Sequence, residues 1–354
     1  MSLFQRPEPV RVAAVGLGRW AGTLADSIKN SERIKIVSCF SRGEKSRAAF
    51  AEKYGCRAAS TYAELLKDPE IEGVVVTTPN DAHAEPILQA AAAGKHVYVD
   101  KPIAHVLSDA VKIERACREA GVVLSVGHSA RRLQGNRKIK EILSRGGLGK
   151  LVMAECNFSN DRSLELTPDK WRWYRDKSPG GPLIQLAVHH VDTLHYLFGP
   201  VKAATAIVKR LYTPAEIEDV TMTLLEMESG QLCYIGSNWA SQGMFYTYVY
   251  GMDANLYFTV DFNFWQKSDV LDGHSRLEIQ HRGSSEHKPV ALGSGDMFRE
   301  ELEEFADCIR EKKPPEIGGK EGIAALAVIE AALRSARERR TVMVQEALEA
   351  GGGG

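Results

Sequence analysis

The stretch Ala13-Ala14-Val15-Gly16-Leu17-Gly18-Arg19-Trp20-Ala21-Gly22 decides the fold of this chain. An apolar run ends in two glycines one residue apart, and the pattern of an amphipathic helix follows. A strand, a glycine turn and a helix in this order form a cradle for phosphate groups. Gly16 allows the tight turn, Gly18 lets a pyrophosphate approach the backbone, and Ala21 lets the helix pack closely on the strand. The helix N-terminus then attracts the phosphates with its free N–H groups.

The first 127 residues alternate between strand and helix patterns. Strands are expected at 34–40, 74–78, 96–99 and 122–126, and helices at 45–54, 62–66, 82–93 and 108–120. Strands separated by helices of this length predict a doubly wound parallel sheet. We therefore expect a dinucleotide-binding Rossmann domain over 1–127.

The pattern changes after Gly127, where helices become fewer and strands follow one another. Helices are expected at 137–144, 183–198, 297–312 and 320–340, and strands at 151–158, 203–211, 220–227, 231–239, 245–250, 255–260 and 277–281. Consecutive strands joined by short turns predict one large, open, mainly antiparallel sheet. We expect an α+β domain over 128–345 that binds substrate and forms oligomers, and a flexible tail over 346–354.

Composition excludes several classes of protein. The chain has 354 residues, 44% of them hydrophobic, and a formal net charge of −1, which gives no electrostatic reason to bind nucleic acid. Its six cysteines form no CxxC pair, so we expect reduced thiols and neither disulfides nor a zinc site. No apolar run approaches the ~18 residues of a membrane span. The N-terminus lacks the pattern of a signal peptide, and a cytoplasmic protein is expected.

The end of the second strand, Phe40-Ser41-Arg42, bears on the choice of nicotinamide cofactor. NAD sites usually place a carboxylate here to bind the ribose 2′-OH, and the first carboxylate in this chain is Glu44. A hydroxyl and a guanidinium suit a 2′-phosphate. We expect a preference for NADP(H), with NAD(H) also possible; the alternative is that Arg42 is a solvated loop residue and both cofactors bind.

Polar residues also follow two further strands, where ligands of parallel sheets bind. The first group is Thr78-Pro79-Asn80, in which Asn80 would reach the cofactor ribose, with His83 as a cofactor contact or a helix-cap residue. The second is Asp100-Lys101-Pro102. Lys101 can stabilise the charge that develops on a substrate oxygen as hydride moves, and Pro102 restricts its direction. The alternative for Lys101 is a solvated surface lysine.

These motifs resemble the glucose–fructose oxidoreductase / inositol dehydrogenase / MocA (Gfo/Idh/MocA) family over nearly the whole chain. They include Gly16 to Ala21, the Lys101-Pro102 pair, Val126-Gly127-His128 and the segment from Gly180 to Asp192. The resemblance implies a Rossmann domain followed by an α/β domain with a large open sheet. It also implies NAD(P)-dependent oxidation or reduction of sugars, cyclitols and related polyols, in dimers or tetramers built on the open sheet face.

Three positions depart from the family pattern. Asp100 stands where a Glu is usual, and Pro182 replaces the third glycine of a Gly-Gly-Gly run. The third departure is Gln185, at a position where the family commonly has Asp. It lies four residues before His189, the general acid/base implied by the resemblance, so an α-helix would put both on one face. Glutamine can position an imidazole but cannot take a proton. Three consequences are open: His189 is a weaker base, Lys101 carries more of the catalysis, or the enzyme favours ketone reduction.

Further candidates border the expected substrate pocket. Aromatic faces stack on sugar rings and Arg binds hydroxyl, carboxylate or phosphate groups; in the resembled family a Trp-Arg pair borders the pocket. Asp192 is expected either to hold the imidazole or to pair with a nearby Arg. His190 and His195 are expected to pack or to cap the helix and not to bind a ligand, and no metal site is expected. The expected catalytic residues are Lys101, His189 and Gln185, and the expected substrate contacts are His128, Arg131, Trp171, Arg172 and Asp192. The expected cofactor contacts are Gly16, Gly18, Arg19, Trp20, Ser41, Arg42, Thr78, Pro79, Asn80, His83, Asp100 and Lys101.

The sequence thus predicts an NADP(H)-preferring oxidoreductase acting on a secondary alcohol or ketone of a sugar, cyclitol or sugar derivative. Two other classes stay open. Some relatives of the resembled family epimerise sugars or hydrolyse glycosides through transient oxidation, with no net redox change. A non-catalytic, cofactor-sensing regulator is the other, supported only by Gln185.

Overall fold

Strand β1 (Val10–Val15) lies inside a six-stranded parallel sheet in the computed structural model, which describes residues 8–352. The strand order is β3-β2-β1-β4-β5-β6, the order of a Rossmann sheet. Its other strands are β2 (Ile34–Phe40), β3 (Arg57–Ala58), β4 (Gly73–Val76), β5 (His96–Asp100) and β6 (Leu124–Gly127). The predicted doubly wound parallel sheet is confirmed.

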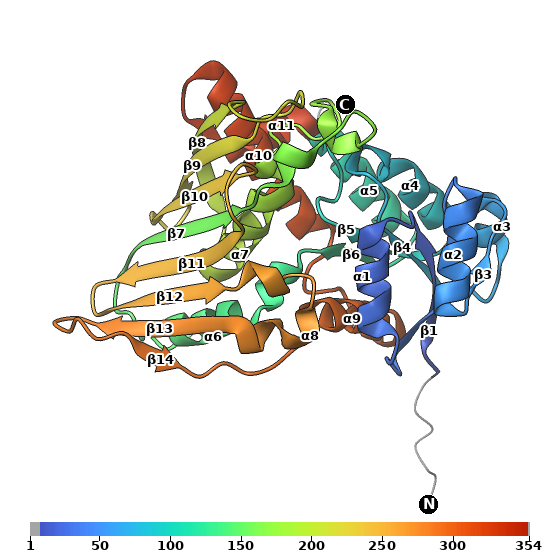
Figure 1. The fold of residues 1–354 in the computed structure, drawn as a ribbon, viewed down its shortest axis with the longest axis horizontal. Helices are drawn as coiled ribbons and strands as arrows, with labels where there is room; N and C mark the ends of the chain where they lie inside the picture. Colours follow the sequence, from blue (N-terminus) through green and yellow to red (C-terminus); the bar gives the residue numbers. More distant parts are fainter. Residues whose placement is uncertain (1–7, 353–354) are drawn as a thin grey trace, which may run out of the picture.

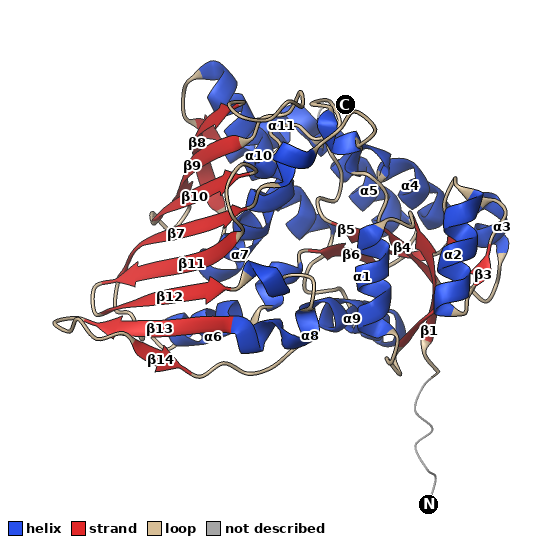
Figure 2. Cartoon of the chain, in the orientation of Figure 1, coloured by secondary structure: helices blue, strands red, loops and turns tan. Residues whose placement is uncertain are grey.

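Five helices accompany this sheet (Figures 1 and 2). They are α1 (Arg19–Ile28), α2 (Glu44–Tyr54), α3 (Tyr62–Lys67), α4 (Ala84–Ala92) and α5 (Leu107–Glu119). Helix α1 buries Ala21, Leu24, Ala25 and Ile28, the face that its apolar spacing predicts. At the turn before α1, Gly16 has a φ of +87°, and a Cβ added there would lie 2.7 Å from the backbone nitrogen of Thr78. The turn therefore requires glycine at Gly16.

The second sheet has nine strands in the order β14-β13-β12-β11-β7-β10-β9-β8-β15. They are β7 (Leu151–Ser159), β8 (Val201–Lys209), β9 (Val220–Met227), β10 (Leu232–Asn238), β11 (Met244–Gly251), β12 (Ala254–Val260), β13 (Ser275–His281), β14 (Lys288–Val290) and β15 (Val342–Met343). Neighbouring strands are antiparallel except β7 and β10, which are parallel. The mainly antiparallel sheet predicted from the sequence is thus confirmed, with one parallel pair at its centre.

Helices α6 (Gln134–Ser144), α7 (Val188–Phe198) and α10 (Gly319–Glu338) pack on the side of this sheet that faces the Rossmann domain (Figure 1). Two more helices of this domain, α8 (Ser268–Leu271) and α9 (Met297–Glu311), pack on each other. Helices α9 and α10 return to the Rossmann domain, where α9 packs on α1 and α10 on α5. The Tyr98 hydroxyl of β5 donates a hydrogen bond to the buried carboxylate of Glu301 in α9 at 2.5 Å. Both domains therefore share one continuous hydrophobic core.

The described part of the predicted flexible tail is helical. Helix α11 spans Val344–Gly352 and packs against α5 and α10. Val344 and Ala347 are buried, a spacing of three residues that places both on one helical face. The prediction of a flexible tail over 346–354 was therefore wrong for residues 346–352, because a short amphipathic helix extends to Gly352.

Two expectations from the sequence concern the ends of the chain, which lie outside the described residues. Residues 1–7, where no signal-peptide pattern was found, and residues 353–354 of the expected tail lie outside the described residues. Between residues 8 and 352, every helix is too short or too polar to cross a bilayer.

Replacing Gly16 by alanine is expected to lower the free energy of unfolding by about 1–3 kcal/mol, since alanine is strained at positive φ. Gly18 is the matched control, with a φ of −81° and nothing within 4 Å of an added Cβ. Gly18→Ala is expected to unfold like the parent protein while weakening dinucleotide binding. Urea unfolding followed by circular dichroism measures the first effect and a titration with NADPH the second; equal stability of the two variants would contradict the role given to Gly16.

Candidate active site

The carboxyl ends of the central Rossmann strands converge at one edge of the sheet. Val15 pairs with Val76, Val76 pairs with Val99, and Asp100 pairs with Gly127. This register brings together the glycine turn, the Thr78 loop, Lys101 and His128. The second domain meets this edge directly, because the Lys101 ammonium donates a hydrogen bond to the main-chain oxygen of Gln185 at 2.9 Å.

Lys101 has a pKa close to neutrality. Loss of hydration lowers it to about 8, with further lowering by the cations of Arg172 and Arg162, while the neighbouring Asp100 carboxylate raises it. Burial in turn raises the pKa of Asp100 to about 6, against the lowering effect of the Lys101 ammonium. The alternative of a solvated surface lysine does not fit, since the Lys101 ammonium is largely removed from water and hydrogen-bonded to the second domain.

Gln185 lies in a π-helical turn, Leu183–Ala187, that runs directly into α7. The sequence predicted an α-helix here. The side chain of Gln185 is buried and contacts Ser178 and Arg172, each at 3.4 Å, and no hydrogen bond joins it to His189. The π turn widens the spacing between residues four apart. Gln185 therefore positions Lys101 through its backbone, and its side chain contacts residues of the preceding loop.

His189 is buried, and its Nδ1 atom has no hydrogen-bond partner among the described residues. Burial holds its pKa well below the ordinary value, and the positive charge of Lys101 and the two neighbouring imidazoles, His128 and His190, add to this effect. His189 was expected to act as the general acid/base. Its imidazole is uncharged near neutral pH, because the ring is buried beside the Lys101 ammonium without a carboxylate partner among the described residues.

His128 and His190 have different surroundings. His128 is 1% exposed, neither of its ring nitrogens has a partner among residues 8–352, and burial lowers its pKa to about 3. Its free nitrogens are available to a ligand. His190 bonds through Nε2 to the Asn157 oxygen at 3.0 Å and stacks on Phe245 with centroids 4.4 Å apart, so it packs, as expected. Among the described residues, His, Cys, Asp and Glu form no group of three or more that could hold a metal.

Arg131 and Asp192 bind one another. Two buried hydrogen bonds join them, Nε to Oδ2 at 3.0 Å and Nη2 to Oδ1 at 2.6 Å. Of the two roles that the sequence allowed for Asp192, pairing with a nearby Arg is the one observed. The bidentate pair uses the groups with which both residues were expected to bind substrate, so a structural role fits them better.

The Thr78 loop divides into a free and an occupied part. Asn80 is 4% exposed, and its Nδ2 donor has no partner within the described chain, so this amide is available to the cofactor. His83 is fully buried, and its two ring nitrogens lie 2.9 Å from the Thr78 oxygen and 3.0 Å from the Pro102 oxygen. Of the two alternatives for His83, a cofactor contact through its ring nitrogens does not fit, because main-chain oxygens engage both of them. Its ring instead ties the Thr78 loop to the segment that carries Lys101, a role that the motif spacing did not indicate.

The segment after β2 presents Ser41 and Arg42, as expected, and a third polar residue, Arg47, contacts it. Arg42 is exposed, and the Ser41 hydroxyl donates to the Gly43 oxygen at 3.3 Å. Arg47, in the first turns of α2, donates from Nη1 to the main-chain oxygens of Ser41 at 2.7 Å and Arg42 at 3.3 Å. The sequence analysis did not single out Arg47, although a cation five residues after Arg42 at a helix start was a visible signal.

Cations from both domains gather at the mouth of the site. Arg19 is exposed in the first turn of α1, beside the half-buried Trp20. Across from it, the Arg172 guanidinium lies over the Trp171 ring at 4.2 Å. Arg162, which the sequence analysis did not single out, lies close enough to lower the pKa of Lys101 and of Arg172. Burial, with the positive charge of Arg19, lowers the pKa of Arg162 itself. The site is therefore electropositive.

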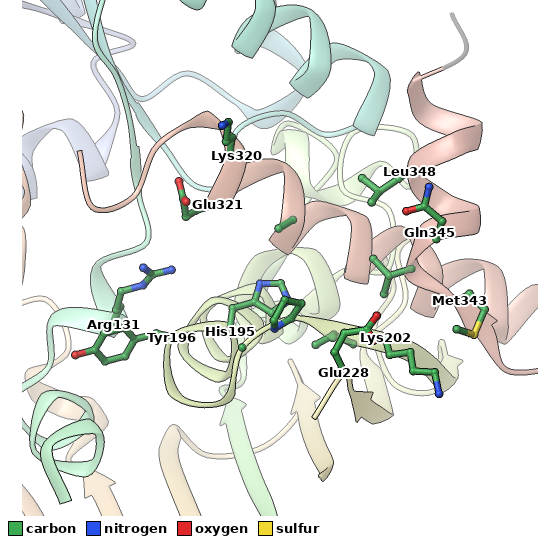
Figure 3. Close-up of a pocket in the computed structure, with 15 residues that line it drawn as sticks. Arg131, His195, Tyr196, Lys202, Glu228, Lys320, Glu321, Met343, Gln345 and Leu348 are labelled. Carbon is green, nitrogen blue, oxygen red and sulfur yellow. The ribbon is translucent and has the colours of Figure 1, made fainter. Parts of the chain in front are cut away.

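A cavity of about 580 Å³ lies apart from this constellation (Figure 3). Its lining comes from the end of α7, the start of α10, β8, β15 and α11, and includes His195, Tyr196, Lys202 and Gln345. Arg131 lies at its margin, and none of Lys101, Gln185 and His189 lines it. This cavity is thus not the place where the candidate catalytic groups meet.

Comparison with known proteins agrees with this arrangement. Residues 10–128 match the model of an oxidoreductase family with an NAD-binding Rossmann fold, and residues 140–344 match the C-terminal α/β domain of the same family, GFO_IDH_MocA. The chain is 27% identical to scyllo-inositol 2-dehydrogenase (NADP⁺) of Bacillus subtilis, over 96% of this chain and 98% of that protein. It is 26% identical to 1,5-anhydro-D-fructose reductase of Ensifer adhaerens, over 89% and 92%.

Solved structures give the same result. A protein of Desulfitobacterium hafniense assigned as an NADPH-dependent oxidoreductase superposes with a TM-score of 0.94 at 43% identity, over 97% of this chain and 100% of that chain. Levoglucosan dehydrogenase in complex with NADH and levoglucosan shares the fold, with a TM-score of 0.84 at 20% identity, over 95% and 100%. Since family models match both domains, the chain belongs to the Gfo/Idh/MocA family of oxidoreductases, with an NAD(P)-binding Rossmann domain.

Proposed function

We propose that the protein is a dehydrogenase or reductase that uses NADP(H), and NAD(H) less well, on a secondary alcohol or ketone of a sugar, cyclitol or sugar derivative. One observation carries the proposal: the Lys101 ammonium, at the carboxyl end of a Rossmann strand, is fixed against the second domain beside two buried imidazoles. Relatives that act on inositol and on anhydrofructose support the substrate class. The six cysteines are all free thiols, which fits a cytoplasmic enzyme.

When bound, the nicotinamide cofactor supplies or accepts the hydride. Lys101 hydrogen-bonds the reacting oxygen of the substrate, gives it a proton during ketone reduction, and takes that proton back during alcohol oxidation. Its pKa of about 8 allows both protonation states near neutral pH. His189 and His128 are uncharged, so we assign them the positioning of substrate hydroxyls, and Lys101 carries more of the proton transfer than His189.

The cofactor contacts follow from the turn at Gly16, the free Asn80 amide and the cations after β2. Ser41, Arg42 and Arg47 offer a hydroxyl and two guanidinium groups where the adenosine ribose would lie, which suits a 2′-phosphate. Arg47 also donates hydrogen bonds to the main-chain oxygens of Ser41 and Arg42. These bonds hold the loop after β2 in place before the cofactor binds.

A redox-neutral reaction is the second candidate. The chain is 23% identical, over 96% of its length, to 2,7-anhydro-N-acetylneuraminate hydratase of Escherichia coli, and hydration changes no net oxidation state. Cofactor that co-purifies with the protein, together with product formation that consumes no added NADP⁺, would favour this candidate. The regulator is disfavoured by the retained Lys101 and His189.

Lys101→Met is expected to reduce kcat by at least about 100-fold, as for loss of one oxyanion donor, with little change in the Kd for NADPH. In the parent enzyme, kcat/KM for ketone reduction is expected to be level below pH 8, near the pKa of Lys101. Above it the value falls about tenfold per pH unit, because the ammonium loses its proton. Alcohol oxidation should rise with pH up to the same point. Near-normal turnover of the variant would remove Lys101 from the mechanism.

NADPH is expected to bind at least about tenfold more tightly than NADH. Arg42→Ala and Arg47→Ala should each reduce this preference by weakening NADPH alone, because both cations lie at the end of β2. Lys45→Ala, at an exposed cation of the same helix, is the control and should leave both Kd values unchanged. Fluorescence titration measures the Kd for NADPH and for NADH of the parent protein and of each variant, and a tenfold preference of the parent protein for NADH would refute the assignment.

The outer face of the nine-stranded sheet fits the expected homodimer or homotetramer. Ile207, Met222, Leu224 and Leu232 are each more than half exposed on neighbouring strands, and such apolar patches mark interfaces. Leu224→Glu should therefore shift the protein to a smaller species in analytical ultracentrifugation. Val270→Glu, on α8 away from this face (Figure 1), is the control. A monomeric parent protein at micromolar concentration would contradict the proposal.

A further inference from the structure

We propose that the substrate carries a carboxylate, as in a sugar acid, and that Arg162 and Arg172 bind it beside Lys101. The inference rests on the proposed function and names the substrate class more narrowly. It starts from two arginines of the second domain that face the site without an ion-pair partner among residues 8–352.

Arg172 is held in place but not neutralised. Its guanidinium lies over the ring of Trp171 at 4.2 Å, and its Nε contacts the neutral Gln185 amide oxygen at 3.4 Å. No described carboxylate lies within 4.0 Å of it. Cation–π stacking and one long hydrogen bond leave most of the five guanidinium N–H donors free. A planar carboxylate can accept two of them side by side.

Arg162 adds a second cation at the same place. It lies in the 3₁₀ turn Arg162–Glu165 that follows β7. Its backbone nitrogen donates a hydrogen bond to Asn160 Oδ1 at 3.1 Å, and its guanidinium makes no hydrogen bond to the described residues. The nearby Asp161 carboxylate raises the pKa of Arg162. In the described chain, however, no carboxylate lies within 4.0 Å of the Arg162 guanidinium to form an ion pair. Arg162 and Arg172 repel each other, and each lowers the pKa of Lys101.

The cost of this arrangement points to a ligand. Partly buried cations that lack counter-charges are unfavourable, and loss of hydration lowers even the Arg172 pKa, to about 9. The Asp100 carboxylate raises the pKa of both Arg172 and Lys101. Its single negative charge can offset only one of the positive charges in this group. Arg19 belongs to the other domain, at the α1 N-terminus where a pyrophosphate would lie. Arg162 and Arg172 thus remain for the substrate.

Other groups around this pair fit the rest of a sugar acid. The His128 nitrogens and His189 Nδ1 are buried and free, so they can bind hydroxyl groups, and the indole of Trp171 offers an apolar face. Gln185 completes the argument, because an aspartate at that position would occupy the Arg172 donors. The neutral amide leaves them available, and a substrate carboxylate supplies the missing negative charge.

The test measures binding to the full-length protein loaded with NADPH. Isothermal titration compares D-glucuronate and D-gluconate with the uncharged D-glucose and with D-glucose 6-phosphate. We expect a sugar acid to bind at least about tenfold more tightly than D-glucose, and Arg162→Gln and Arg172→Gln each to weaken it by roughly 10- to 100-fold, as for loss of a charge-assisted hydrogen bond. Gln185→Asp should weaken it similarly by pairing with Arg172.

Arg175→Gln is the matched control, because Arg175 lies in the same loop, is exposed, and pairs with Glu218 at 3.2 Å. It should leave sugar-acid binding unchanged. The inference is overturned if D-glucose binds as tightly as both acids, if only the phosphate ester binds, or if the Arg162 and Arg172 variants weaken NADPH instead of the acid. Turnover of neutral sugars alone would overturn this inference and leave the proposed dehydrogenase intact.

Discussion

One hydrogen bond joins the two halves of this molecule at the point where chemistry is proposed: Lys101 Nζ to the Gln185 oxygen, 2.9 Å long. The donor sits at the end of a Rossmann strand, and the acceptor belongs to the π turn that begins α7. The acceptor is a main-chain oxygen, so the contact does not depend on which side chain stands at Gln185. The position of the ammonium therefore depends on how the second domain packs against the first.

This packing also sets the protonation of the site. Lys101 is largely removed from water, and the nearby Arg162 and Arg172 oppose its charge, so its pKa approaches neutrality. Burial, with the positive charge of Lys101 and the neighbouring imidazoles, holds the pKa of His189 well below its ordinary value and keeps the ring uncharged. In a site with an acidic partner for the imidazole, histidine would be the natural proton carrier. Here the neutral Gln185 removes that possibility, and lysine becomes the group with a pKa suited to proton transfer.

The sequence predicted whatever depends on local pattern. Alternating strands and helices with a glycine turn gave the Rossmann sheet, and Lys101, Asn80 and His128 lie at strand ends as expected. Features that depend on tertiary contacts could not be predicted from the sequence. His83 has a cofactor-motif spacing yet bonds two carbonyl oxygens, and the pairing of Arg131 with Asp192 needs residues 61 apart. The π turn escaped because its apolar spacing resembles that of an α-helix.

Charge explains why Arg162 was overlooked and why it matters. A single arginine in a polar loop has no periodic signal, and its role emerges only when folding brings it beside Arg172 and Lys101. Lys101, Arg162 and Arg172 carry three positive charges, and Asp100 offsets one of them. A neutral ligand would leave the remaining positive charge without a partner, whereas an anionic ligand would be attracted by it. A carboxylate bound there would also raise the lysine pKa, since opposite charge favours the ammonium. Substrate binding and proton supply would then be coupled through the same few side chains.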